Sequence, residues 1–255
     1  MRTEISEKWV RAMVGGTAIV DTRTPMLFWE DSFPVPSYAF AAADVRTDLL
    51  IPTEQNPASH NFFHLPKGPV AQWFDLHVDG KVFNNAAWIR DDPSVHDRIV
   101  FTWQAGVVDR WLEEDEEVHS HPRDPYKRVE ALHSSRHVRV SLDGVTLAET
   151  SSPVLLFETY LPIRYYFPKA DVDLSKLRSS HNRSQCPYKG FADEYWDAPN
   201  TPGVAWSYPH PYPGVQAIEG RVAFYNELVD IAVDGVDLPR PESVFSLKKH
   251  RPGND

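Results

Sequence analysis

The sequence has very little cysteine, no long apolar run and a deficit of positive charge. Cys186 is the only cysteine among 255 residues, which excludes an internal disulfide and every structural zinc site built from two or more cysteines. No stretch approaches the roughly 20 consecutive apolar residues that a membrane-spanning helix needs. Residues 1–16 contain no apolar run of signal-peptide length. We therefore expect a cytoplasmic protein with no membrane partner.

The charge balance argues against a nucleic-acid partner. The chain has 26 Lys and Arg against 36 Asp and Glu, which gives a net charge of −10 and a pI near 5.5. Such a chain repels phosphate backbones. The histidines are dispersed and no phosphate-binding glycine-rich loop is present, so the sequence predicts no metal site and no cofactor.

Proline and aromatic residues are abundant. The chain has 22 prolines, 12 glycines and 12% aromatic residues. Because proline ends helices and is confined to strand edges and turns, an architecture of long helices is excluded. The length fits one large domain or two domains of about 120 residues each.

An internal repeat organises the chain. Residues 16–30 (GTAIVDTRTPMLFWE) align without a gap with residues 144–158 (GVTLAETSSPVLLFE). Four further blocks match in the same order: Tyr38–Val45 with Tyr165–Val172, Lys67-Gly68 with Lys189-Gly190, Ala87-Trp88 with Ala205-Trp206, and Asp97–Phe101 with Gly220–Phe224. This predicts two homologous domains at 8–113 and 128–238. An exposed acidic linker with prolines (114–127) joins them, and a poorly ordered tail (239–255) follows.

Within each repeat the local pattern is that of β-structure. Short β-branched or aromatic runs are bounded by Pro, Gly or Asn, and Asp143-Gly144 between two such runs is a hairpin signal. Helix-period segments are few and short. We expect a mainly β protein made of two antiparallel domains in tandem with few short helices.

Four blocks of the second repeat carry a family resemblance. They are RYYFPKADV from Arg164, CPYKG from Cys186, AWSYPHP from Ala205 and GRVAFY from Gly220. Together they resemble the family called domain of unknown function 427, which also has a nucleotidyltransferase-like label. The first repeat looks like a diverged copy. The resemblance implies domains of the antiparallel β-tent type, distantly similar to methionine sulfoxide reductase B and to the ligand domain of cereblon.

The resemblance brings no settled activity. The chain has no Gly-Ser pair followed by a strand with paired carboxylates, which weakens the nucleotidyltransferase label. The first repeat departs from the family pattern, because His64-Leu65-Pro66 stands where the second repeat has Cys186-Pro187-Tyr188. Thiol chemistry is therefore excluded from the first repeat.

Comparison of the repeats separates the two faces of one strand. Tyr38 and Phe40 match Tyr165 and Phe167, which predicts a shared core face. The other face differs between the repeats. There, Arg164 and Tyr166 either line a site found only in the second repeat or form a solvated, partly aromatic surface.

A tryptophan recurs in both repeats, as Trp88 and Trp206. It is either a core anchor or one wall of an aromatic pocket that holds a planar or cationic ligand. Tyr208, two residues after Trp206 on the same strand face, favours the pocket in the second repeat, whereas Arg90 occupies the matching position in the first.

A lysine followed by glycine also recurs, and so does a glutamate at the end of an apolar run. Lys67 and Glu30 in the first repeat match Lys189 and Glu158 in the second. They form either a structural ion pair or the polar centre of a ligand site, in which the lysine binds an anion or forms a Schiff base. Cys186 is either a thiol activated by Lys189 or a small buried residue.

Three functions stay open at this point. The leading hypothesis is the binding of an unidentified small molecule in an aromatic-lined pocket of each domain or of the second alone. Its residues are Trp206, Tyr208, Tyr166, Lys189 and Glu158, with Trp88, Lys67 and Glu30 as first-repeat counterparts. The alternative is an enzyme acting on a nucleotide-like or other small substrate through Lys189 and Glu158, or through Cys186. The third is a structural or protein-interaction module.

Overall fold

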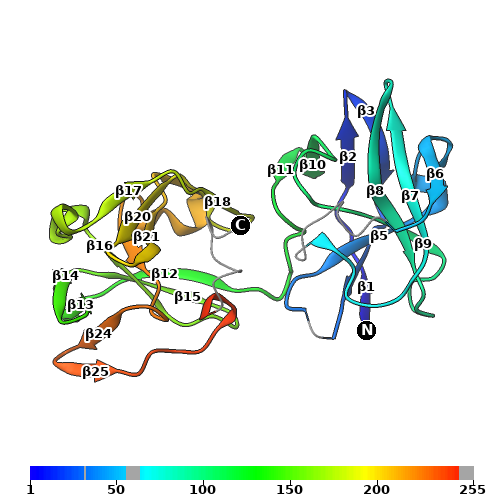
Figure 1. Ribbon diagram of the computed structural model, residues 1–255. Coiled ribbons are helices and arrows are strands. Elements are labelled where there is room, and N and C mark those ends of the chain that lie inside the picture. The colour runs from blue at the N-terminus through cyan, green and yellow to red at the C-terminus, as the bar shows by residue number, and fades with distance from the viewer. Residues whose placement is uncertain (32, 56–63, 247–255) are drawn as a thin grey trace. The chain divides into compact units, whose positions relative to one another are not determined.

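The chain folds into two compact units. The computed structural model describes residues 1–31, 33–55 and 64–246, and the units are Met1–Asp124 and Pro125–Asp255. We call them the first and second unit. In Figure 1 the first unit runs from blue to green and the second from green to red.

The first unit consists of two antiparallel sheets. In sheet order, the seven-stranded sheet contains β1 (Arg2–Ile5), β4 (Met26–Trp29), β5 (Ser37–Ala41), β9 (Arg98–Phe101), β8 (Lys81–Arg90), β7 (Val70–Val78) and β6 (Leu50–Thr53). The four-stranded sheet contains β11 (Glu116–Val118), β10 (Arg110–Glu113), β2 (Val10–Val14) and β3 (Thr17–Thr22).

The second unit repeats this arrangement. Its seven-stranded sheet contains β12 (Val129–His133), β15 (Val154–Glu158), β16 (Arg164–Phe167), β23 (Val222–Phe224), β21 (Thr201–Ser207), β20 (Glu194–Ala198) and β17 (Arg178–Ser180). Its four-stranded sheet contains β14 (Val145–Thr150), β13 (Val138–Leu142), β24 (Asp230–Val233) and β25 (Val236–Leu238). A small additional sheet contains β18 (Ser184–Cys186), β19 (Gly190–Ala192) and β22 (His210–Pro211).

The described helical segments are short 3-10 turns. In the first unit they are η1 (Ala42–Asp44) and η2 (Thr47–Leu49). In the second unit they are η4 (Lys169–Asp171), η5 (Leu174–Lys176), η6 (Pro213–Ile218) and η7 (Val244–Ser246). The prediction of a mainly β chain with two homologous halves is confirmed.

Strand register matches equivalent residues of the two units at the paired strands. Trp88 of β8 lies opposite Val100 of β9, and Trp206 of β21 lies opposite Ala223 of β23, as the aligned blocks require. The hairpin turns also match, since Gly15-Gly16 joins β2 to β3 as Asp143-Gly144 joins β13 to β14. All four turn residues have positive φ, the backbone conformation of such two-residue turns.

The predicted core face is confirmed in both units. Tyr38 and Phe40 lie in the main apolar cluster of the first unit, and Tyr165 and Phe167 lie in that of the second. The opposite face of the same strands forms a second, smaller cluster around Trp88 in the first unit and around Trp206 in the second. The aromatic positions singled out in the sequence therefore belong to this smaller cluster.

Two segments outside the repeats differ from the expectation. Part of the acidic stretch forms β11, which pairs with β10 and belongs to the first unit. The tail was expected to be poorly ordered, but its residues Ser243 and Phe245 contact the second unit. Residues 247–255 of the tail lie outside the described part of the chain.

Candidate functional site

The second unit brings its five predicted site residues into one cluster. Glu158 ends β15, Tyr166 lies in the middle of β16, Trp206 lies in β21 with Tyr208 just beyond it, and Lys189 directly precedes β19. Tyr166 is fully buried, and Tyr208 and Trp206 are 4% and 6% exposed. The cluster is therefore packed within the unit.

A buried ion pair forms the polar part of this cluster. The Lys189 ammonium contacts Glu158 Oε2, and Lys127 Nζ lies 3.2 Å from Glu158 Oε1. The side chains of Lys189 and Glu158 are 10% and 6% exposed. Gly190 has a φ of +96°, so the turn that delivers Lys189 to the glutamate needs glycine next to it.

The two cations keep Glu158 ionised. Burial by itself disfavours the carboxylate, but Lys189 and Lys127 outweigh it, and the pKa of Glu158 is lowered. Burial likewise disfavours the Lys189 ammonium, but the negative charge of its neighbours, with Glu158 as the ionised ion-pair partner, outweighs burial, and the pKa of Lys189 is raised. Lys189 therefore remains an ammonium at neutral pH, which suits an ion pair and not a nucleophile.

Tyr166 fills the space beside Trp206. The indole Nε1 of Trp206 donates to the Tyr166 hydroxyl at 3.3 Å, and the two rings meet edge to face with centroids 6.4 Å apart. Burial raises the pKa values of Tyr166 and Tyr208, so both hydroxyls stay neutral. Neither of the two cavities described below is lined by Trp206, Tyr208 or Lys189.

Sequence reasoning missed the acidic partner of Arg164. The Arg164 guanidinium forms a two-pronged pair with Glu227, with both N···O distances 2.7 Å, and their side chains are 5% and 1% exposed. Arg164 also lies 5.5 to 5.7 Å from the rings of Trp206, Tyr225 and Phe245. The predicted alternative of a solvated surface is therefore wrong for both Arg164 and Tyr166, which is fully buried.

In the first unit the equivalent glutamate has a different cation. Glu30 contacts Arg90 Nη1 through Oε1, whereas its Oε2 accepts the backbone N–H of Lys67 at 2.8 Å. Arg90 occupies the position of Tyr208, so the cation comes from strand β8 here and from a loop lysine in the second unit. Gly68 allows this pairing, because a Cβ added there would lie 2.5 Å from Arg90 Nη2.

With Arg90 on the glutamate, the Lys67 side chain turns to other groups. Its Nζ donates to the carbonyl of Leu65 at 2.7 Å and lies 4.5 Å from the ring centre of Phe33. Burial lowers the pKa of Lys67 to about 8, and Glu30 opposes this shift only in part. Lys67 thus titrates close to neutral pH, unlike Lys189.

Trp88 lacks the neighbour that Trp206 has. Ala39 occupies the position of Tyr166, so this position offers no hydroxyl to the indole. Trp88 is 4% exposed, and its Nε1 has no hydrogen-bond partner in the described part of the chain. A buried indole N–H normally finds an acceptor, since leaving one unpaired costs about 1–3 kcal/mol.

A small cavity adjoins Trp88 and Lys67. It measures about 30 Å³, enough to admit a water molecule or a small polar group. Glu30, Lys67, Trp88, His64, Trp103 and His121 are among its lining residues. The three first-unit candidates therefore share one cavity, which we call the Trp88 cavity.

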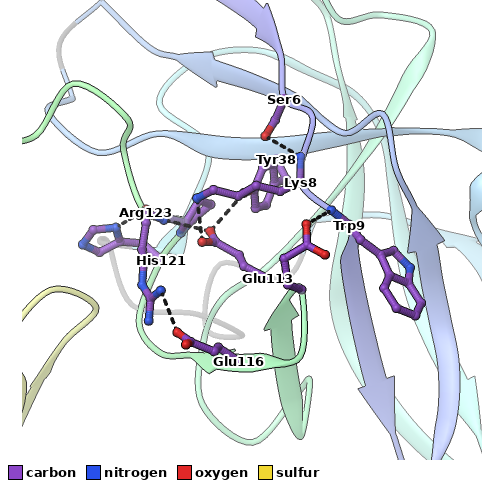
Figure 2. A network of polar contacts seen from close by, with 10 residues as sticks. Ser6, Lys8, Trp9, Tyr38, Glu113, Glu116, His121 and Arg123 are labelled. Atoms are coloured by element: carbon purple, nitrogen blue, oxygen red, sulfur yellow. Dashed lines mark hydrogen bonds and ion pairs between the residues drawn. The ribbon is translucent and has the colours of Figure 1, made fainter. Parts of the chain in front are cut away.

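A second polar network of the first unit centres on Glu113 (Figure 2). Its carboxylate, 4% exposed, accepts hydrogen bonds from Lys8 Nζ at 2.7 Å, the Tyr38 hydroxyl at 3.0 Å and the Arg123 backbone N–H at 3.1 Å. Glu113 ends β10 and directly precedes the acidic stretch 114–127. Strand register matches Glu113 to Val233, so the network has no counterpart in the second unit.

The remaining features add no reactive centre to the described structure. Cys186 is a half-buried free thiol. Among residues 1–31, 33–55 and 64–246, no group of three or more His, Cys, Asp or Glu is placed to hold a metal ion. Within the same residues, no helix has the length and apolar character needed to cross a membrane.

Comparison with known proteins identifies the domain but no activity. A family model described as a domain of unknown function (DUF427) matches the chain twice, over residues 2–114 and 130–235. The two matches fall one in each unit. A search of curated proteins found no match.

Proposed function

The chain belongs to the DUF427 family as a tandem of two copies, and we propose that its first copy binds a small molecule through a carboxylate or carbonyl oxygen in the Trp88 cavity. The observation that carries the proposal is that Trp88 lines this cavity and that its buried Nε1 has no acceptor among the described residues. Lys67 supplies a positive charge at the same cavity. An N–H donor and an ammonium together suit a small anion.

The second unit supports this assignment by contrast. There the hydroxyl of Tyr166 satisfies the indole, and the lysine is committed to Glu158. The residue set predicted for a ligand in the second repeat thus fits a structural role better, whereas its diverged counterparts in the first repeat retain space and an available donor. The half-buried free thiol of Cys186 suits a reducing compartment and supports the cytoplasmic location that we propose.

Acetate is the probe that tests the Trp88 cavity. In a ¹⁵N-labelled full-length chain titrated with acetate in place of chloride, we expect a saturable shift of the Trp88 indole N–H signal. Lys67→Met should weaken binding severalfold. In unmodified protein, affinity should fall as pH rises through about 8, because Lys67 loses its charge there. A Trp206 indole signal that does not move is the internal control.

Trp88→Phe separates binding from folding. The substitution removes an N–H that bonds to none of the described residues, so its cost in stability should be limited to the packing that the smaller ring loses, while acetate binding is lost. Trp206→Phe is the matched variant and should leave acetate binding intact. Equal shifts at all indoles, or binding that survives Trp88→Phe, would contradict the proposal.

Catalysis through Lys67 is a second candidate, favoured by its lowered pKa beside a cavity. A neutral lysine amine attacks an aldehyde or ketone carbon, and loss of water leaves an imine. The predicted alternative placed such chemistry on Lys189, whose raised pKa opposes it.

Reductive trapping tests this candidate. With glyoxylate and borohydride, hydride reduction of the imine should leave a carboxymethyl group on Lys67, which peptide mass spectrometry detects. Lys169, whose side chain is 42% exposed, sets the background for an ordinary surface lysine. Labelling of Lys67 no faster than Lys169 would count against catalysis and leave acetate binding untouched.

A further inference from the structure

The second unit contains a larger cavity that none of the predicted site residues lines. It measures about 240 Å³ and lies where β16, β24 and the chain after β25 meet. Its lining is mostly apolar and rich in proline: Pro162, Ile163, Tyr165, Asn226, Val229, Ile231, Leu238, Pro239, Arg240 and Pro241. We call it the Tyr165 cavity.

The first unit shows what occupies the equivalent place. Strand register matches Ile231 to Trp111, because each lies opposite the equivalent residue of the neighbouring strand. Asn226 matches Trp103 for a similar reason. The backbone N–H of Thr102 donates to the carbonyl of Ala86, the backbone N–H of Tyr225 donates to the equivalent carbonyl of Val204, and Trp103 and Asn226 are the next residues. The second unit therefore has two much smaller side chains where the first has two indoles.

The two indoles of the first unit form a stacked pair. The rings of Trp103 and Trp111 are nearly parallel, with centroids 4.3 Å apart, and Trp103 also contacts Tyr38 at 6.4 Å. Val118 packs at the same edge and is 2% exposed, whereas its counterpart Leu238 is 37% exposed. With smaller residues in place of the indoles, the second unit has a cavity here and leaves Leu238 at its edge exposed.

The Tyr165 hydroxyl, at the same place, lacks the carboxylate partner that Tyr38 has in the first unit. In the first unit the Tyr38 hydroxyl donates to Glu113, but the second unit has Val233 there. Tyr165, the counterpart of Tyr38, is 5% exposed, and no hydrogen bond joins its hydroxyl to another described residue. Of the polar residues in the lining, Asn226 bonds to Ile163 and Arg164, and Arg240 bonds to Asp230. A mostly apolar space with the Tyr165 hydroxyl at its wall suits an aromatic ligand that carries one polar atom.

We propose that the Tyr165 cavity binds a small planar aromatic molecule with a single hydrogen-bonding group, in the place that Trp103 and Trp111 fill in the first unit. The volume of the Tyr165 cavity, about 240 Å³, suits a two-ring compound. For comparison, an apolar cavity of about 150 Å³ in another protein takes up benzene, which has one ring. This site is independent of the Trp88 cavity and lies in the other unit.

Indole is the probe, and indene, which has the same shape without the N–H, is its control. By saturation-transfer NMR on the full-length chain, we expect saturable indole binding in the millimolar range or tighter. Indene should bind more weakly by about threefold to tenfold, which corresponds to one neutral hydrogen bond. Tyr165→Phe should reduce indole binding to the level of indene.

Two variants fill the cavity and one does not. Ile231→Trp restores the first-unit residue, and Leu238→Trp adds an indole at the exposed rim, where folding is not at risk; both should abolish indole binding. Val145→Trp, on an exposed position of β14 that does not line the cavity, should leave binding unchanged.

Three outcomes would overturn the proposal. One is the absence of saturable indole binding. Another is binding that persists unchanged in both cavity-filling variants. The third is a severalfold rise in indole affinity when residues 247–255 are removed, which would assign the cavity to the tail of the chain instead of a separate small molecule.

Discussion

Lys189→Met is expected to destabilise the second unit by about 3–5 kcal/mol, because it leaves Glu158 buried with a weakened counter-charge. Lys127 remains 3.2 Å from the other carboxylate oxygen, so the loss should lie at the lower end of this range. Hydrogen exchange of amides in β15 and β21 of the full-length chain reports on this unit alone.

Lys67→Met is the matched control. Glu30 keeps its contact with Arg90 in that variant, and the Lys67 backbone N–H remains in place. We expect a change below about 1 kcal/mol in the first unit, as for most half-exposed substitutions. If the two substitutions destabilise their units equally, the conclusion that Glu30 relies on Arg90, whereas Glu158 relies on Lys189, is refuted.

The loss in Lys189→Met should depend on pH in a defined direction. The pKa of Glu158 is lowered, so its stabilising contribution is present above the unfolded value of about 4.3 and disappears as the pH falls through the folded value. The pKa of Lys189 is raised, so its contribution is present below the unfolded value of about 10.4 and disappears only at still higher pH. The difference between parent and variant should therefore be largest between about pH 5 and 10.

Arg164→Met should be about as damaging, at roughly 3–5 kcal/mol, because Glu227 would be left buried without its two-pronged partner. The substitution also removes the guanidinium that contacts Trp206, Tyr225 and Phe245. The measurement is the urea dependence of amide hydrogen exchange in β16, which reports the free energy of unfolding of the second unit.

The double variant Arg164→Met/Glu227→Met tests the cause. Removing both charges together leaves no uncompensated ion, and apolar replacement of a whole buried pair is often close to neutral. The double variant should therefore recover most of the stability that the single variant loses. The single variant Glu227→Met completes the comparison. If the stability losses of Arg164→Met and Glu227→Met simply add in the double variant, the guanidinium acts through its ring contacts and not through Glu227.

Much of the fold could be predicted from the repeat. The aligned blocks place Trp88 with Trp206 and Tyr38 with Tyr165, and strand register agrees at these positions. Alternation along one strand was enough to identify the core face, because residues two apart share a face. The pairing of Lys189 with Glu158 was also among the open alternatives, since an acid that ends an apolar strand needs a cation.

The differences between the two sites could not be predicted in the same way. Whether a tryptophan N–H has an acceptor depends on a residue two strands away, Ala39 in one unit and Tyr166 in the other. The Arg164–Glu227 pair joins residues 63 positions apart, with no local pattern to link them. The sequence comparison identified Arg90 only as the residue at the position of Tyr208. Its contact with Glu30 depends on the close approach of the Arg90 guanidinium to the backbone of Gly68, which a side chain at Gly68 would block.

The glutamate that ends β4 and β15 restricts the order in which the two copies can have diverged from a common ancestor. A chain that lost the loop lysine before it gained the strand arginine would pass through a buried, uncompensated carboxylate. The reverse order is viable, and the first unit still carries both cations, Lys67 and Arg90. Because Arg90 compensates Glu30, the Lys67 side chain is released from charge compensation, and substitutions of Lys67 should be nearly neutral to folding. The same substitution at Lys189 should cost the second unit several kcal/mol, so the effect of losing the lysine depends on whether the strand arginine is present.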